Sequence, residues 1–181
     1  MSRLLRRTLP PLLLAGFLVP TAPAAGATCA GATAAPSSLS ASTAKRVTLC
    51  LLNRERYRHG LRPLHSNPRL ERAARGHSHD MVASNLFSHA SSDGGGLVGR
   101  VRRAGYLSGA HGWTVGENIG WGQSSLASPA TMVRMWMHSS GHRANILKGS
   151  YRDIGIGIID GTPVRGGGQG TTYTTDFGSR G

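Results

Sequence analysis

Acidic residues are scarce in this chain, which has eight Asp and Glu against 21 Lys and Arg in 181 residues. The formal net charge is +13 at pH 7, and the only lysines are Lys45 and Lys148. Such a surplus attracts anionic envelope polymers or membranes without sequence preference. A solvated basic surface from an arginine-rich composition explains the surplus equally well. No nucleic-acid-binding motif occurs, so nucleic acid is not an expected partner.

Long apolar runs are also rare, and the clearest one, Leu12–Val19, is too short to span a bilayer. It follows a basic stretch and precedes small-residue cleavage sites, which predicts a secretory signal peptide over residues 1–27. We therefore expect export by the general secretory route, while the Arg6-Arg7 pair leaves the twin-arginine route open. Cleavage there removes three basic residues and no acidic one, which leaves a net charge of +10.

Only two cysteines are present, and in an exported chain they predict one disulfide, Cys29–Cys50. It would tie the N-terminal segment of the mature protein to the first helix, and the loop-entropy model gives it about 3 kcal/mol. Lipid modification of Cys29 is the alternative, but the large aliphatic residue usual three positions before such a cysteine is missing. Neither cysteine lies near a histidine-bearing motif, so a cysteine-based catalyst is not expected.

The hydrophobic pattern predicts a single α+β domain without internal repeats. The Ala-, Ser-, Thr- and Pro-rich composition of residues 28–43 predicts a flexible leader. Asn67-Pro68 predicts a helix start, because Asn is a favoured N-cap and Pro suits the first helical position. We expect helices at 45–60, 67–84, 97–104 and 128–138, the last followed by a turn through 146. Strands are expected at 154–159 and 171–177, joined by a glycine-rich hairpin connection. Residues 113–121 are expected to form a strand or extended loop interrupted by glycines.

Three short motifs place histidine or glutamate beside glycine, serine or aromatic residues: Phe87-Ser88-His89, Gly116-Glu117-Asn118-Ile119 and the segment 136–143. In this order, from about 47 to 177, they resemble the CAP superfamily of secreted proteins (cysteine-rich secretory, antigen 5 and pathogenesis-related-1 proteins), in particular its compact bacterial branch. The resemblance implies a three-layer α-β-α sandwich with a central antiparallel sheet, in a domain spanning 44–181.

The same resemblance locates a candidate site. In this family a cleft commonly holds two histidines and two acids. By motif, His89 and His142 match the histidines and Glu117 matches the first acid, so these three are the candidate ligand-binding and catalytic residues. Arg134 stands where many members carry the second acid, which makes the cleft less negative and weakens any cation there.

Three functions remain open. The leading one is a secreted, monomeric protein that binds a small-molecule, lipid or cell-envelope ligand without catalysis. The first alternative is a metal-dependent hydrolase or protease, in which His89 and His142 hold a divalent metal such as zinc and Glu117 is a ligand or general base. No His-Glu-x-x-His helix or nucleophile elbow supports an enzyme. The second alternative is a structural envelope module that acts through its basic surface, and a hydrogen-bonded structural cluster also explains the three residues.

The other histidines are expected to be structural or exposed. His77 shares an apolar helix face with Leu70 and Met81, which predicts a hydrogen-bonded core residue, and His79 on the opposite face is expected to be exposed. His138, one turn after the position of the missing acid, is a reserve ligand. The remaining histidines, His59, His65 and His111, are expected in loops or on the surface.

The aromatic and amide residues near the motifs have simple structural interpretations. Trp136 is expected to anchor the core, whereas Trp113 and Trp121 flank the second motif and either line a ligand or pack. Asn53 and Asn145 are expected to cap or cross-link the backbone.

Overall fold

The structure is a computed structural model that describes residues 28–181. The signal peptide predicted for residues 1–27 therefore lies outside the described residues. The elements, in chain order, are η1 (Pro36–Ser38), α1 (Ala41–Arg58), β1 (His65–Ser66), α2 (Pro68–Ser84), α3 (Leu97–Arg103), β2 (Trp113–Gly122), η2 (Ser124–Ala127), α4 (Pro129–His138), α5 (Ser140–Ile146), β3 (Asp153–Asp160) and β4 (Thr171–Arg180).

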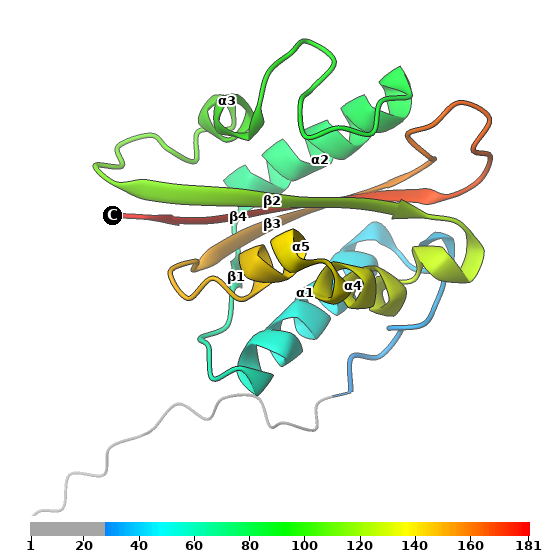
Figure 1. The fold of residues 1–181 in the computed structure, drawn as a ribbon, viewed down its shortest axis with the longest axis horizontal. Coiled ribbons are helices and arrows are strands. Elements are labelled where there is room, and N and C mark those ends of the chain that lie inside the picture. The colour runs from blue at the N-terminus through cyan, green and yellow to red at the C-terminus, as the bar shows by residue number, and fades with distance from the viewer. Residues whose placement is uncertain (1–27) are drawn as a thin grey trace, which may run out of the picture.

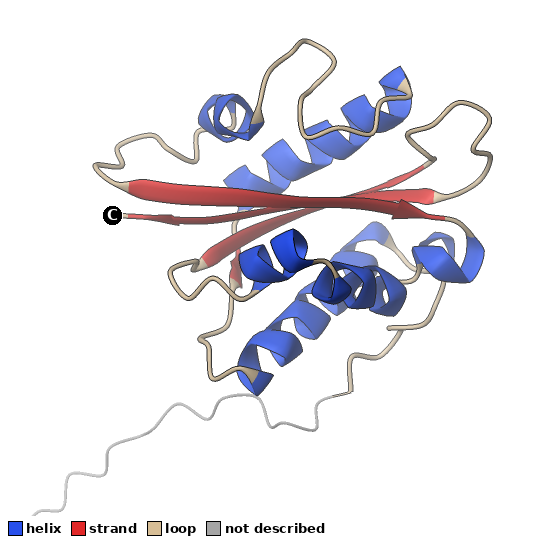
Figure 2. Cartoon of the chain, in the orientation of Figure 1, coloured by secondary structure: helices blue, strands red, loops and turns tan. Residues whose placement is uncertain are grey.

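These elements form three layers (Figures 1 and 2). A four-stranded sheet lies in the middle, α2 and α3 cover one face, and α1, α4 and α5 cover the other. The three-layer α-β-α sandwich implied by the family resemblance is thus confirmed.

The helix ends follow local capping chemistry. The Asn67 side chain accepts hydrogen bonds from the first backbone N–H groups of α2, which confirms the predicted N-cap. Helix α1 begins at Ala41, four residues before the predicted start, because the Ser40 side chain accepts a hydrogen bond from the N–H of Thr43. The segment after α4 is the helix α5 rather than the predicted turn, and Ser139 separates the two.

The sheet has the order β1-β3-β4-β2. Its three long strands are antiparallel, as predicted, but β1 pairs in parallel with β3, so the sheet is mixed. A strand of two residues is too short to leave an alternating pattern in the sequence. Strand β2 lies at the edge and runs without interruption through Gly116, where a Cβ would lie 2.2 Å from the hydroxyl of Tyr151. The glycine therefore permits the close approach of a neighbouring side chain and does not interrupt the strand.

The two faces of the sheet pack differently. The main core lies between the sheet and α1, α4 and α5, and it includes Trp136, Tyr173 and Phe177, each at most 2% exposed. On the other face, Cβ atoms at Gly155 and Gly157 would lie 2.0 and 2.4 Å from backbone atoms of α2. Helix α2 therefore rests directly on the glycines of β3.

The N-terminal segment is attached to the first helix by the predicted disulfide, Cys29–Cys50. Composition predicted a flexible leader over residues 28–43; residues 28–40 contain turns and η1, and 41–43 begin α1. Cys29 is 8% exposed in the main core. The carbonyl of Ala32 also accepts a hydrogen bond from the N–H of Ala130. No helix within the described residues has the length and apolar character needed to cross a membrane.

Candidate functional site

Glu117 is the centre of a charged cluster where β2 meets the α2–α3 layer. Its side chain is only 2% exposed, and both carboxylate oxygens accept hydrogen bonds. His89 Nδ1 lies 2.7 Å from Oε1, and Arg100 Nη2 lies 2.5 Å from Oε2. Burial alone would raise the pKa of Glu117, but the hydrogen bond from His89 and the charge of Arg100 hold that pKa below its ordinary value.

Arg100 holds the cluster together from α3. Its side chain is 5% exposed, and besides the bond to Glu117 its Nη1 donates to the carbonyls of His89 and Gly95 and to the hydroxyl of Ser91. One guanidinium therefore fixes the loop that carries His89 as well as the carboxylate that faces it. A planar donor with five N–H groups is suited to such a role.

His89 is the exposed member of the cluster, with 60% of its side chain accessible. Its Nδ1 is engaged with Glu117, so Nε2 is the ring nitrogen available to a ligand. The hydrogen bond to Glu117 raises the pKa of His89 above its ordinary value. The arrangement favours the charged form of an exposed imidazole and keeps the opposing carboxylate buried.

His77 and Asp176 complete the buried surroundings of Glu117. His77 is fully buried, its Nε2 donates to the carbonyl of Ser88, and it lies 3.8 Å from Glu117 Oε2. Burial lowers the pKa of His77 and keeps the imidazole neutral. Asp176 is paired with Glu117 across β2 and β4, and burial, then the Glu117 charge, raise its pKa well above its ordinary value. We name His89, Glu117, Arg100 and His77 the His89 site.

The structure places the His89 imidazole against Glu117, whereas the link between His142 and β2 runs through its backbone carbonyl and Asn118, the residue after Glu117. Alternation along β2 directs Glu117 toward α2 and α3, whereas Asn118 points toward α5 and donates to the carbonyl of His142. The imidazole of His142 makes no hydrogen bond to Glu117. Burial, and secondarily the charge of His89, lowers the pKa of His142.

The three-ligand metal centre of the hydrolase alternative does not fit this arrangement. Within residues 28–181, no three His, Cys, Asp or Glu side chains are grouped so that they could hold a metal ion. Both oxygens of Glu117 and Nδ1 of His89 are already used in hydrogen bonds. No ligand set of two histidines and a carboxylate, such as some catalytic zinc sites use, is therefore formed.

Residues at and after the position of the second acid point away from the cluster. Arg134 is exposed and donates to the hydroxyl of Thr131, and His138 Nδ1 contacts the carbonyl of Arg134 in its own helix. No contact of His138 in the described part of the chain supports the role of reserve ligand that the sequence predicted for it. Trp113, 44% exposed, and the half-buried Trp121 project from the same face of β2 as Glu117.

Most structural assignments made from sequence are confirmed. His77 is buried and hydrogen-bonded, and His79 is exposed, as are the three histidines expected on the surface. Trp136 is buried and donates to the carbonyl of Ile119. Asn53 bridges to the backbone of Leu64, and Asn145 donates to the carbonyl of Glu117 and to the side chain of Asn118.

Sequence reasoning missed Arg100 and Asp176. Arg100 falls at helical spacing with Leu97 and Ala104, so a charge on an apolar helix face was the available signal. Asp176 is the only charged residue between Thr171 and Phe177, in a strand buried on both faces. A buried charge in such a place needs a partner or a raised pKa, and either would have marked it as a site residue.

Comparison with known proteins agrees with this geometry. Residues 49–177 match the model of the CAP family, described as the cysteine-rich secretory protein family. The chain is 38% identical over 145 residues to the uncharacterized protein YkwD of Bacillus subtilis (strain 168), covering 80% of this chain and 50% of YkwD. It is 34% identical over 116 residues to the uncharacterized membrane protein YlbC of the same strain, covering 64% of this chain and 32% of YlbC. The chain thus spans half or less of these relatives.

Solved structures show the same fold. An extracellular protein containing an SCP domain from Bacillus anthracis has a TM-score of 0.58 at 30% identity, over 77% of this chain and 43% of that one. An outer surface protein of Borrelia burgdorferi has a TM-score of 0.65 at 15% identity, over 79% of this chain and 97% of that one. With the family model matched over most of the described residues, the chain belongs to the CAP, or cysteine-rich secretory protein, family.

Proposed function

We propose that the protein is exported and binds an anionic group of a cell-envelope ligand at the His89 site, without catalysing a reaction. The observation that carries this proposal is the state of Glu117. Both of its oxygens accept hydrogen bonds inside the protein, and the resulting low pKa makes the carboxylate a weak acceptor for a proton from a substrate. What it does instead is favour a positive charge on the exposed ring of His89.

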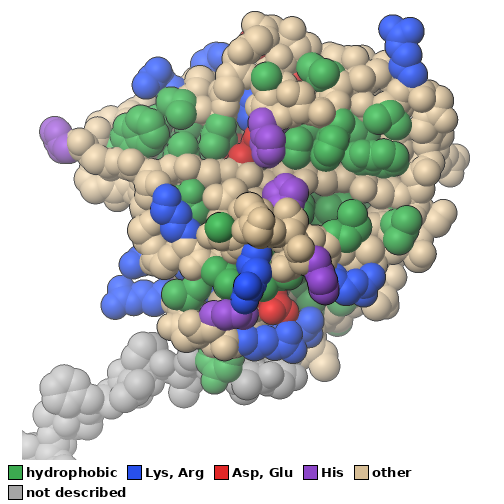
Figure 3. All heavy atoms as spheres, in the orientation of Figure 1, with side chains coloured by type: hydrophobic (Ala, Val, Ile, Leu, Met, Phe, Trp, Pro, Cys, Tyr) green, Lys and Arg blue, Asp and Glu red, His purple; other side chains and the backbone are tan. Residues whose placement is uncertain are grey.

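The surroundings of His89 support the same ligand chemistry. The face of the molecule drawn in Figure 3 has few acidic side chains, and its lysines and arginines are scattered among histidines and hydrophobic side chains. The cluster of Arg100, Glu117 and a protonated His89 carries one net positive charge, and the whole chain is strongly basic. An anionic polymer would be attracted by the surface and held locally by the imidazolium.

The test is binding of the purified protein to isolated bacterial cell walls at pH 6 and pH 8. We expect stronger binding at pH 6, because His89 loses its charge as the pH rises through its raised pKa. His89→Gln should weaken binding by about tenfold at pH 6 and remove the pH dependence, since a charge-assisted hydrogen bond contributes roughly 1.5–3 kcal/mol. His79→Gln, which changes an exposed histidine of α2, is the matched control and should bind like the wild type.

Each alternative predicts a different result in the same assay. Salt-sensitive binding that survives loss of both His89 and His142 would assign the function to the basic surface as a whole. Stoichiometric zinc binding, together with hydrolysis of the cell wall that is lost in His89→Gln, would replace the proposal by the metal-dependent hydrolase.

A further inference from the structure

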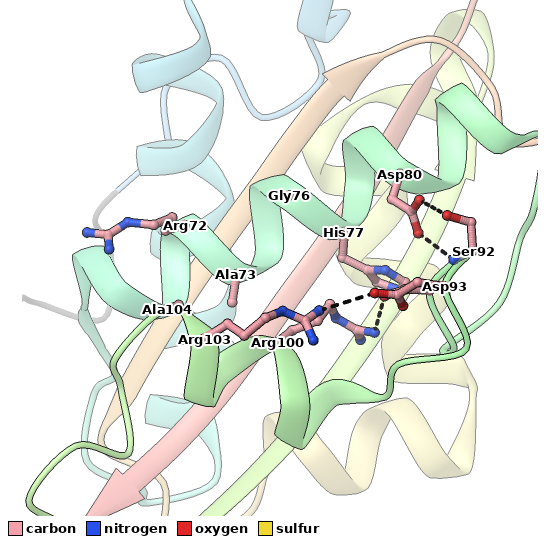
Figure 4. Close-up of a pocket in the computed structure, with 11 residues that line it drawn as sticks. Arg72, Ala73, Gly76, His77, Asp80, Ser92, Asp93, Arg100, Arg103 and Ala104 are labelled. Atoms are coloured by element: carbon pink, nitrogen blue, oxygen red, sulfur yellow. Dashed lines mark hydrogen bonds and ion pairs between the residues drawn. The ribbon is translucent and has the colours of Figure 1, made fainter.

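A cavity of about 360 Å³ opens between α2, the 91–93 segment and α3. Figure 4 shows its lining, with His77 and Arg100 in the wall. We name it the α2–α3 pocket; its lining comes from residues 72–80 of α2, 91–93 of the loop and 100–104 of α3. His77 and Arg100 belong both to the His89 site and to this lining, whereas His89 and His142 do not line the pocket.

Small residues on the facing helices keep this space open. Ala73 and Gly76 of α2 lie opposite Ala104, so no long side chain from either helix fills the gap at these positions. A Cβ added at Gly76 would meet no atom within 4 Å. The pocket can therefore accept atoms from a ligand without displacing the helix backbone.

The loop wall of the pocket is held in place by its own hydrogen bonds. The Asp80 carboxylate accepts from both the N–H and the hydroxyl of Ser92, which fastens the loop to α2. Within the loop, Ser91 N–H donates to the carbonyl of Gly95, and Gly95 N–H donates to Asp93 Oδ1. The wall thus exists before any ligand arrives, as is usual for small-molecule sites.

The lining has a surplus of hydrogen-bond donors. The two acids accept hydrogen bonds, Asp80 from Ser92 and Asp93 from Gly95. Arg103 makes only an exposed ion pair with Asp93, at 3.8 Å and without a hydrogen bond. Among the described residues, Arg72 has no ion-pair partner at all. A ligand that balances this lining must bring acceptors.

The buried part of the lining points to a ligand as well. Arg100 and His77 are each at least nine-tenths buried, and Arg100 Nε and His77 Nδ1 have no hydrogen-bond partner. Buried polar atoms without partners are rare in native proteins, because each costs free energy. Two of them in residues that line one cavity are typical of a site that a polar molecule completes.

We propose that the α2–α3 pocket binds a small polar molecule that carries a phosphate or carboxylate group. The oxyanion pairs with the guanidinium of Arg103, whose planar fork matches two acceptor oxygens. The body of the ligand occupies the space over Gly76. The proposal does not rest on the function proposed for the His89 site, because the envelope ligand contacts the exposed ring of His89 and the pocket ligand contacts Arg103, although Arg100 and His77 are common to both surroundings.

The test is an NMR titration of the ¹⁵N-labelled protein with two polyol probes, glycerol 3-phosphate and gluconate, and with glycerol as the neutral control. We expect saturable shifts of the Gly76 amide and the Arg103 side chain with at least one charged probe and none with glycerol. Tighter binding of glycerol 3-phosphate identifies phosphate as the preferred group, and tighter binding of gluconate identifies carboxylate.

Variants then separate the pocket from the basic surface. Arg103→Gln should weaken binding about tenfold, whereas Arg102→Gln, an exposed neighbour outside the lining, should change it less than about twofold. Gly76→Leu should abolish binding by filling the space, and helix content by circular dichroism checks that it is folded. His89→Gln should bind the probe like the wild type.

Three results would overturn the proposal. One is the absence of saturable binding by either charged probe. Another is equal weakening by Arg102→Gln and Arg103→Gln, which would indicate general attraction to a basic surface. The third is unchanged binding in a folded Gly76→Leu variant; should that variant not fold, the comparison of the two arginine variants decides alone.

Discussion

The face of the sheet beneath α1, α4 and α5 carries large apolar side chains, whereas the face beneath α2 and α3 carries glycine, threonine and charge. On the first face Tyr173 and Phe177 pack with Trp136. On the second face the neighbouring positions of β4 are Thr174 and Asp176, and the hydroxyl of Thr174 accepts a hydrogen bond from Ser78 of α2. One strand thus supplies the core and the site by simple alternation. The two faces should respond differently to mutation.

The largest effect is expected on the apolar face. Trp136→Ala should lower the free energy of unfolding by about 3–5 kcal/mol, because it removes a buried indole and leaves the carbonyl of Ile119 without its donor. Chemical denaturation measures the change. Trp113→Ala, on an indole that is 44% exposed, is the control and should cost less than about 1 kcal/mol. Similar losses in both variants would contradict the proposed division of the faces.

A slightly smaller effect is expected from the charge buried on the polar face. Glu117→Gln leaves the guanidinium of Arg100 buried without its counter-charge and should cost about 3 kcal/mol. The same α3 helix offers a control, since Arg103 and Asp93 are both about 60% exposed. Asp93→Asn should change the free energy of unfolding by less than about 1 kcal/mol, because exposed pairs contribute little. Equal losses of unfolding free energy in Glu117→Gln and Asp93→Asn would mean that Glu117 is solvated.

Asp176 should behave in the opposite way and destabilise the protein at neutral pH. Burial and the Glu117 charge raise its pKa in the folded state, so its contribution to stability is most favourable at low pH and falls as the pH rises toward that raised pKa. Asp176→Asn removes the ionisable group, so its stability does not fall as the pH rises in this way. The variant should be about 1–2 kcal/mol more stable than the wild type at pH 7. Denaturation at pH 4, 6 and 8 should show the gain growing with pH, and a constant difference would be inconsistent with the titration of Asp176.

The smallest effect is expected from the exposed end of the cluster. Because Glu117 raises the pKa of His89 in the folded state, the pair stabilises the protein below the ordinary histidine pKa, and this contribution is lost as the pH rises through the raised value. His89 is 60% exposed, so solvent screening limits the contribution to less than about 1 kcal/mol. NMR titration should give His89 a pKa above the ordinary histidine value. A pKa at or below that value would show that the hydrogen bond to Glu117 does not persist in solution.

Sequence patterns predicted the local parts of this structure and missed those that depend on register. The Asn67-Pro68 cap and the helix it begins were readable, because capping chemistry is local. Strand β1 was not, since two residues give no periodicity. The family motifs identified Glu117 and His89 but could not show that Asn118, next to Glu117 in β2, binds the backbone carbonyl of His142. The two contacts lie on opposite sides of β2 because successive strand residues alternate in direction.

The charged partners were missed for a related reason. Glu117 and Asp176 lie 59 positions apart in the chain and meet only because β2 and β4 pair in one register. Arg100 reaches them from a third element, α3. Contacts of this kind depend on the assembled fold, so a single sequence carries only the indirect signal of a charge among apolar neighbours.

The side chains that cover the backbone of β2 also bear on how the protein behaves when it is concentrated. An edge strand presents free carbonyls that can template pairing with another chain and begin aggregation. In β2, the carbonyl of Glu117 accepts a hydrogen bond from the Asn145 side chain, and the carbonyl of Ile119 accepts one from the Trp136 indole. An incoming strand would find these acceptors already taken at the middle of the edge. The protein can therefore keep a ligand-accessible strand at its border while the centre of that strand resists self-association.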